Sequence, residues 1–274
     1  MIKEISQQVV TSRIINLSSL MISLTTICRV AFGIRYDEET HERRNFDELL
    51  IVTQEMLAAF FVSDYFPLLG WIDKLSEKQV DLRRIFKDLD EFYKGLIEHH
   101  LNLNRPKSME GDIIDLLLQL KKEKSTPIDL TLDSIKAIIM NMLVAGTDTS
   151  AATIIWAMTA LIANPNAMKK VQAEIRESVV KNSIVNEDNV QKLPYFKAVI
   201  KETLRLDPEI WKNSEEFIPE RFLNNDIDFK SQDFELIPFG AGRRGCPAIA
   251  LGVANVELVL SNLLYAFDGS CLVG

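Results

Sequence analysis

A long apolar segment, Thr131 to Ala163, is the feature that most constrains how this chain folds. At about 1.5 Å per residue, a helix over this segment is roughly 50 Å long and crosses a whole globular molecule. Asn164-Pro165 follows the segment and ends the helix. The central Asp148 would cost about 2.5–3.5 kcal/mol inside a bilayer. We therefore expect a buried helix of a soluble fold rather than a membrane span.

Most other segments also have a helical period. Apolar residues recur at three- and four-residue steps from Val80 to Ile97, with charged residues on the opposite face. Shorter helical patterns cover Asp112–Leu120, Ala167–Val180, Tyr195–Leu206 and Ala248–Phe267. Strand signals are few and weak, and Phe234–Ile237 is one of them. We predict a mainly α fold with little β structure, in a single domain over residues 1–274.

Composition excludes several classes of partner and site. The net charge of -8 and the pI near 5.1 leave no basic stripe for phosphates, so nucleic acid is not expected as a partner. The odd number of cysteines does not make a disulfide framework; they are Cys28, Cys246 and Cys271. No Cys-x-x-Cys or His-x-x-x-His pair predicts structural zinc. The histidines are expected at the surface; they are His41, His99 and His100.

One cysteine lies between a glycine-rich loop and an apolar helix, in the sequence Phe239-Gly-Ala-Gly-Arg-Arg-Gly-Cys-Pro247. The glycines let the backbone pass close to a flat ligand, and the helix N-terminus stabilises an anion. Cys246 is therefore expected as a thiolate, which binds iron. The same loop also satisfies the dinucleotide pattern Gly-x-Gly-x-x-Gly from Gly240 to Gly245. Pro238 interrupts the strand-to-loop junction that this competing interpretation needs.

The middle of the long segment carries a polar group of residues, Ala145-Gly-Thr-Asp-Thr-Ser150. One interpretation is a kink, because glycine and hydroxyl side chains loosen buried helices. The other is a functional site, because a buried Asp148 beside Thr149 needs a polar cavity or ordered water.

A third group of residues is charged. Glu202 and Arg205 lie three residues apart on one helical face, and alone they predict only a solvated ion pair. Apolar neighbours from Ala198 to Leu204 favour a buried face instead. Downstream, Pro219-Glu-Arg-Phe222 supplies another arginine, Arg221.

Together these three motifs resemble the cytochrome P-450 family of haem-thiolate monooxygenases, of the plant microsomal type. The family's haem loop is Phe-x-x-Gly-x-Arg-x-Cys-x-Gly, and this chain has an alanine, Ala248, in place of the last glycine. The matching residues are Phe239, Gly242, Arg244 and Cys246. The oxygen-activation helix, Ala/Gly-Gly-x-Asp/Glu-Thr-Thr/Ser, matches at every position from Ala145 to Ser150. Glu-x-x-Arg and Pro-Glu-Arg-Phe match the third group.

The resemblance implies a role for each residue. Cys246 would hold haem b (iron protoporphyrin IX) through its thiolate, Arg244 would pair with a propionate, and Phe239 would pack beside the sulfur. Asp148 and Thr149 would relay protons during oxygen activation. Ala145 and Gly146 would leave room for oxygen. A structural charge network would lock the core through Glu202, Arg205 and Arg221.

The resemblance also implies partners and a location. The expected reaction inserts one oxygen atom from O2 into a small apolar substrate, with electrons from an NADPH-dependent cytochrome reductase that docks near Arg243. Residues Leu57–Leu69 would line substrate entry or belong to the ordinary core. The family points to the endoplasmic reticulum membrane, although the sequence shows no transmembrane anchor.

The resemblance extends from Lys3 to Asp268 but is incomplete. The chain is expected to lack the family's N-terminal anchor and early helices, its C-terminal end, and a long segment between Arg205 and Pro219. The join falls at Leu206–Trp211. The alternative is therefore an inactive remnant or splice fragment with weak haem binding.

Overall fold

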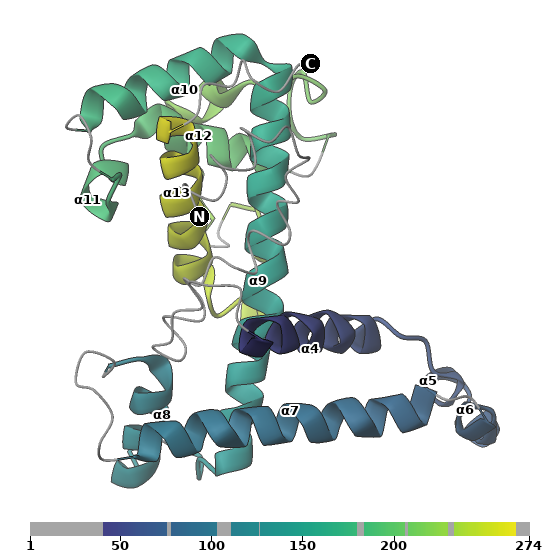
Figure 1. Cartoon of the computed structure of the whole chain (residues 1–274). Helices are drawn as coiled ribbons and strands as arrows, with labels where there is room; N and C mark the ends of the chain where they lie inside the picture. Colours follow the sequence, from purple (N-terminus) through teal and green to yellow (C-terminus); the bar gives the residue numbers. More distant parts are fainter. Residues whose placement is uncertain are drawn as a thin grey trace. The chain divides into compact units, whose positions relative to one another are not determined.

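The computed structural model describes residues 41–75, 78–102, 111–125, 127–179, 184–205, 208–229 and 233–266. The regular elements in these ranges are all helices and none is a strand, which agrees with the predicted mainly α fold (Figure 1). The described chain divides between Asp148 and Thr149 into two compact units, which we call the N-terminal unit and the C-terminal unit. Cys28, Cys271, and the join residues Leu206 and Asp207 lie outside the described residues.

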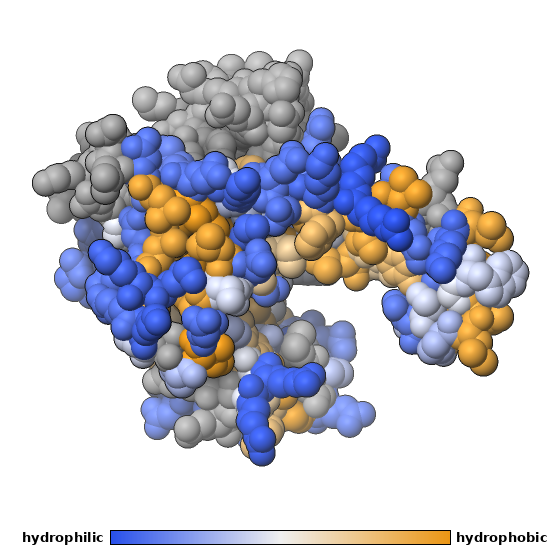
Figure 2. Space-filling model, turned by 90° about the horizontal axis from the view of Figure 1, so that it is seen from below, coloured by the Kyte–Doolittle hydropathy of each residue, from blue (hydrophilic) through white to orange (hydrophobic). Residues whose placement is uncertain are grey.

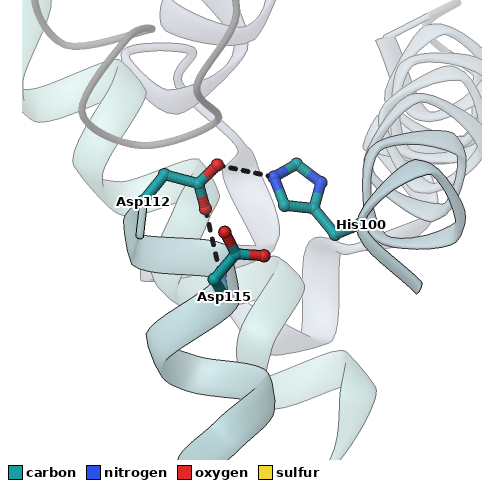
Figure 3. Close-up of side chains that lie close together, drawn as sticks. All are labelled: His100, Asp112 and Asp115. Atoms are coloured by element: carbon teal, nitrogen blue, oxygen red, sulfur yellow. Dashed lines mark hydrogen bonds and ion pairs between the residues drawn. The ribbon is translucent and has the colours of Figure 1, made fainter. Parts of the chain in front are cut away.

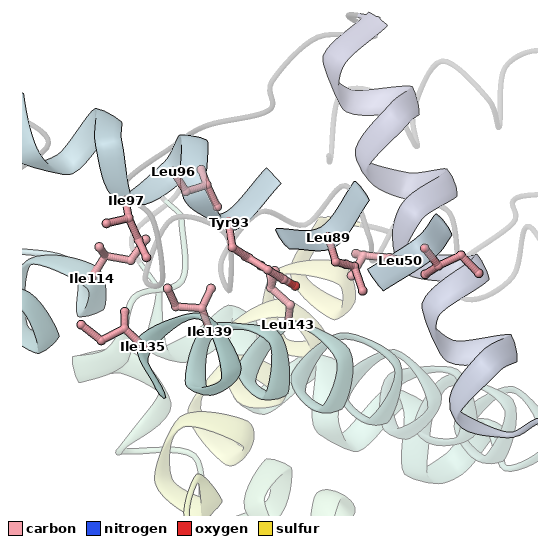
Figure 4. Close-up of a cluster of buried hydrophobic side chains, with 10 residues drawn as sticks. Leu50, Leu89, Tyr93, Leu96, Ile97, Ile114, Ile135, Ile139 and Leu143 are labelled. Carbon is pink, nitrogen blue, oxygen red and sulfur yellow. The ribbon is translucent and has the colours of Figure 1, made fainter. Parts of the chain in front are cut away.

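The N-terminal unit is built from helices around one apolar cluster (Figure 4). Its elements are α4 (His41–Leu57), α5 (Val62–Tyr65), η1 (Pro67–Leu69), α6 (Trp71–Leu75), α7 (Lys78–Leu101), α8 (Ile113–Glu123) and the first half of α9 (Leu132–Ala163). The buried cluster comprises Leu50, Ile85, Leu89, Tyr93, Leu96, Ile97, Ile114, Ile135, Ile139 and Leu143. Their three- and four-residue spacing along α7 and α9 explains why these two long helices share the cluster.

Polar contacts fix the elements around this cluster. Lys136 Nζ on α9 lies 2.6 Å from Asp90 Oδ1 on α7. Asp73, which is buried, accepts hydrogen bonds from the backbone amides of Val62 and Ser63 at 2.9 and 2.8 Å. These amides begin α5 and have no partner within it, so Asp73 folds α6 back onto α5.

The C-terminal unit contains the second half of α9 and several shorter elements. They are α10 (Pro165–Ser178), α11 (Glu187–Val190), α12 (Pro194–Thr203), η3 (Pro219–Phe222), η4 (Gly242–Arg244) and α13 (Ile249–Ala266). Helix α10 packs against α12 and α13. The carboxylate of Glu174 on α10 accepts hydrogen bonds from the backbone amides of Tyr195 and Phe196 at 2.9 and 2.8 Å. These bonds cap the start of α12.

The structure bears on the predicted strand and on the expectation that the long apolar helix is buried. The strand predicted over Phe234–Ile237 is wrong, because Leu236 N donates to Asp233 O at 2.9 Å and closes a turn. The long helices α9 and α13 are apolar and long enough to cross a membrane, by length and composition, within the described ranges. Of the most apolar 18-residue stretch in each helix, 33% is buried in the fold for α9 and 44% for α13.

Candidate functional site

The loop that carries Cys246 is closed by its own backbone. Cys246 N donates to Phe239 O at 2.9 Å, and Gly245 N donates to Gly242 O at 3.1 Å. Gly240 and Gly242 have φ of +72° and +75°, which L side chains rarely adopt. The two glycines are therefore required by the path of the loop.

Helix α13 follows this loop directly. The first helical hydrogen bond runs from Gly252 N to Ala248 O at 2.8 Å, two residues after Cys246. A Cβ on Gly252 would lie 3.6 Å from Phe239 Cε1, so the Phe239 ring lies against the first turn. Cys246 is a free, half-buried thiol in the loop that leads directly into α13, an 18-residue helix that begins at Ile249.

The residues present fit a haem held through a thiolate. Cys246 is the kind of soft donor that binds haem iron, and it forms no disulfide. The space around Gly242 is open, because a Cβ built there meets no heavy atom within 4 Å. Arg244, on the same loop, is exposed and offers a cation to an anionic group.

The polar residues of α9 do not break the helix, and Asp148 is not buried. Thr147 Oγ1 donates to Leu143 O at 2.7 Å, and the helix continues to Ala163. The buried face follows three- and four-residue steps through Leu143, Thr147 and Ser150. Asp148 and Thr149 lie off this face and are exposed. The expected burial of Asp148 is therefore wrong, because the neighbouring threonine and serine occupy the inner face.

The three predicted charged residues lie together. Arg205 Nε donates a hydrogen bond to Glu202 Oε1 at 3.2 Å. Arg221 Nε lies 2.9 Å from Glu202 Oε2, and this second contact is an ion pair without hydrogen-bond geometry. The side chains are 0%, 10% and 12% exposed for Glu202, Arg205 and Arg221. Burial raises the pKa of Glu202, and the amide of Ile218 and the two guanidinium groups oppose this shift.

The arginines of this network also hold the chain that follows α12. Arg221 donates to the carbonyls of Lys212, Asn213 and Glu216 at 2.7, 3.1 and 3.3 Å. Arg205 donates to Ser214 O. The short connection between α12 and η3 is thus held at four backbone carbonyls.

The predicted site residues fall into three groups in the structure. Phe239, Gly242, Arg244 and Cys246 share one loop, and Glu202, Arg205 and Arg221 share one network. Ala145, Gly146, Asp148 and Thr149 lie in the middle of α9. Asp148 ends the N-terminal unit and Thr149 begins the C-terminal unit.

Sequence reasoning missed a buried polar group in the N-terminal unit. His100, expected at the surface, has a side chain that is 0% exposed, and its Nε2 lies 2.8 Å from Asp112 Oδ2 (Figure 3). Asp112 caps α8 by accepting from Asp115 N at 3.0 Å. The pattern Asp-x-x-Asp before an apolar run is a capping signal, and it marks Asp112 as a residue with a structural role.

Comparison with known proteins identifies the family. The cytochrome P450 family profile matches residues 1–208 and 206–272. The 5-OH-xanthotoxin synthase of Pastinaca sativa is 43% identical over 314 residues, which cover 98% of this chain and 62% of that protein. Cytochrome P450 71A1 of Persea americana is 40% identical, with the same two coverages. This chain belongs to the cytochrome P450 family.

The fold agrees with this family. A zebra fish cytochrome P450, solved with progesterone, matches with a TM-score of 0.73 at 22% identity, over 90% of this chain and 64% of that one. This likeness shows the helical P450 fold. The chain spans about 62% of the length of the curated relatives named above.

Proposed function

We propose that this chain is a haem-thiolate monooxygenase that inserts one oxygen atom from O2 into a small apolar substrate, in plant specialised metabolism. The observation that carries the proposal is the closed loop from Phe239 to Cys246, which presents a free thiol at the start of α13. Relatives named 5-OH-xanthotoxin synthase and 6,7,8-trihydroxycoumarin synthase, both from Pastinaca sativa, support the metabolic context.

The loop residues would bind the cofactor. When bound, haem b supplies the redox centre at which O2 is activated. Cys246 would bind the haem iron through its thiolate. Arg244 would pair with a propionate, and Phe239 would exclude water from the sulfur side of the loop. The positive φ of Gly242 favours glycine, so the loop carries no side chain at this position.

The residues of α9 would move protons. Asp148 is exposed, so it can exchange protons with water, and the adjacent Thr149 hydroxyl can pass one on. Ala145 and Gly146 present little side-chain bulk one turn earlier, which would leave room for oxygen. Glu202, Arg205 and Arg221 would be structural and would not contact the substrate.

The electron donor would be an NADPH-dependent cytochrome reductase. Arg243 is exposed on η4, three residues before Cys246, and would supply positive charge to the docking surface. A reductase that docks there would present acidic groups.

The N-terminal unit supports a location at the endoplasmic reticulum membrane. The segment from Leu57 to Leu75 exposes many large apolar side chains, so the interpretation of Leu57–Leu69 as ordinary core is wrong. The most exposed are Leu57, Phe60, Tyr65, Phe66, Leu68, Trp71 and Leu75. Hydrophobic side chains of this kind are visible at the right-hand edge of Figure 2. Exposed apolar side chains that gather in one segment mark protein or membrane contact sites, and aromatic residues are enriched at membrane interfaces.

A second candidate is an inactive remnant with weak haem binding, a single partial P450 domain over residues 1–274. The family profile matches in two pieces that meet at residues 206–208. The alignment with the Pastinaca sativa relative spans 314 residues, more than the 274 of this chain. Both observations support the absence of an internal segment between Arg205 and Pro219.

A carbon monoxide difference spectrum of the reduced, haem-reconstituted protein separates the two candidates. A thiolate-type Soret band that disappears in Cys246→Ser and persists in Cys28→Ser supports the monooxygenase. A spectrum without such a band in the unmodified chain supports the remnant. Turnover with reductase and NADPH then tests the activity itself.

A further inference from the structure

The loop that carries Cys246 is rich in glycine and needs support from outside itself. Gly240 and Gly242 both have positive φ, and glycine loses more conformational freedom on folding than any other residue. The backbone bond from Cys246 N to Phe239 O, at 2.9 Å, joins the two ends of the loop. The position of Phe239 therefore sets where Cys246 lies.

The Phe239 ring has two neighbours outside the loop. A Cβ added to Gly252 on α13 would lie 3.6 Å from Phe239 Cε1, so the ring lies close to this helix. The second neighbour is Phe229, whose ring centroid lies 5.9 Å from that of Phe239 at an interplanar angle of 84°. Aromatic pairs prefer this edge-to-face arrangement. Phe229 thus fixes the side chain of the residue whose carbonyl accepts from Cys246 N.

The segment before Phe229 is held by a lysine of α12. The half-buried Lys201 donates from its Nζ to Ile227 O, a carbonyl two residues before Phe229. Ile227 and Phe229 also pack against a small apolar cluster. Its buried members are Ala198, Phe222 and Leu236. Lys201 therefore anchors Phe229 to α12 through the backbone of Ile227.

Asp233 folds the chain between the two rings. Its Oδ2 accepts from Asp228 N at 2.9 Å, and its carbonyl accepts from Leu236 N at the same distance. Asp228 directly precedes Phe229. Leu236, which is buried, lies three residues before Phe239. These two bonds turn the chain back on itself, which brings the two rings together.

We propose that Phe229, anchored by Lys201, is a positioning residue that keeps the Cys246 loop closed before any cofactor binds. Its ring acts through Phe239, whose carbonyl accepts from Cys246 N. A loop that is already ordered loses less conformational entropy when a ligand binds. The ordered loop would therefore bind haem more tightly, a consequence that rests on the proposed function.

The alternative is that Phe229 contributes only to the apolar cluster. Its removal would then weaken the C-terminal unit as a whole, without a particular effect on the loop. Phe222 belongs to the same cluster and is 4% exposed, but its ring partner is Trp211, at 5.0 Å between centroids. Phe222→Leu is therefore the matched control, because it removes a ring from the cluster at a different place.

Amide hydrogen exchange of the full chain, without haem, tests the proposal. Isotope labelling at cysteine gives one amide signal for each of the three cysteines, and Cys28→Ser and Cys271→Ser assign them. An aromatic pair favours its closed state by a factor of about two to ten. Phe229→Leu is therefore expected to speed exchange of the Cys246 amide by about that factor. Phe222→Leu is expected to lower the urea midpoint of unfolding without this change.

The variants also define the results that would overturn the proposal. Phe229→Tyr keeps the ring and is expected to keep the slow exchange of the Cys246 amide. An exchange rate in Phe229→Leu equal to that of the wild type would contradict the positioning role. So would equal rates in Phe229→Leu and Phe222→Leu, because only the overall stability of the unit would then matter.

Two lysines of α12 test the anchor. Lys201→Met removes the donor to Ile227 O and is expected to speed exchange of the Cys246 amide as well. Lys197 lies one turn earlier, and its Nζ donates to Gln191 Oε1 at 2.6 Å. Lys197→Met therefore leaves the Ile227 carbonyl paired. Equal exchange rates in the two lysine variants would contradict the role of Lys201.

Haem binding is measured separately, because it depends on the proposed function. In the haem-reconstituted protein, the thiolate-type Soret band with carbon monoxide is expected to require more haem in Phe229→Leu than in the wild type. A wild-type chain that never forms this band refutes the proposed function. The exchange rates of the haem-free protein decide the role of Phe229 in either case.

Discussion

Arg221→Met tests whether the charge network around Glu202 stabilises the C-terminal unit. The substitution preserves most of the side-chain length but removes the ion pair at 2.9 Å and the hydrogen bonds to three carbonyls. It leaves Glu202, with a side chain that is 0% exposed, short of one cation. Breaking a buried pair in this way costs about 3–5 kcal/mol, which lowers the folding equilibrium constant by a factor of about one hundred to several thousand.

Urea unfolding followed by circular dichroism measures this loss, and Lys170→Met is the matched control. Lys170 pairs with Glu220, the residue before Arg221, but the two side chains are 61% and 42% exposed. An exposed pair contributes about 0–1 kcal/mol. If Arg221→Met costs no more than Lys170→Met, the network is not a stabilising element and the reasoning fails.

The direction of the Glu202 pKa adds an internal check. Burial already raises the pKa of Glu202, and removing Arg221 takes away one group that opposes this shift. A raised folded pKa means that stability is gained as the carboxylate takes up its proton. The deficit of Arg221→Met should therefore shrink as the pH falls toward about 4.3, the ordinary glutamate value. Adding Glu202→Gln should recover part of the loss at neutral pH, and no recovery would refute the argument.

Three further predictions follow from single side chains. Burial and Glu220 raise the pKa of Tyr195 to about 12. The stability that the protonated Tyr195 contributes is therefore present below about pH 10 and lost as the pH rises through about 12. An absorbance titration should show a late tyrosinate step that Tyr195→Phe removes. Asp73→Ala strands two backbone amides at the start of α5 and should cost about 1–3 kcal/mol, with faster hydrogen exchange confined to that turn. Gly242→Ala adds a methyl group in open space at φ +75° and should destabilise the fold by about 1 kcal/mol. Gly95→Ala adds one in open space within α7 and should stabilise the fold by about 1 kcal/mol. Two losses of equal size would show that the backbone angle φ is not the cause.

Helical periodicity located the long elements well because it depends only on neighbours in the sequence. The segment predicted over Thr131–Ala163 is α9, Leu132–Ala163, and the one predicted over Ala248–Phe267 is α13, Ile249–Ala266. The strand predicted over Phe234–Ile237 failed because a strand needs a partner. Four apolar residues in a row do not show whether a partner exists.

Burial of polar residues was harder to predict than the helices themselves. Asp148 was expected inside and His100 outside, and the structure has both the other way round. Thr147 and Ser150 lie on the inner face of α9. A small hydroxyl side chain can be buried there when it donates a hydrogen bond to a backbone carbonyl, as Thr147 does to Leu143 O. His100 is buried because Asp112, twelve residues away, reaches its ring. Such contacts depend on tertiary packing.

The connection between α12 and η3 has a consequence for sequence variation. Its carbonyls at Lys212, Asn213, Ser214 and Glu216 are what the two arginines bind. Every amino acid carries a carbonyl, so substitutions along these positions should be tolerated as long as the spacing is unchanged. Asn213 is the exception, since its φ of +53° favours asparagine or glycine. A one-residue insertion or deletion here should be more damaging than most side-chain replacements.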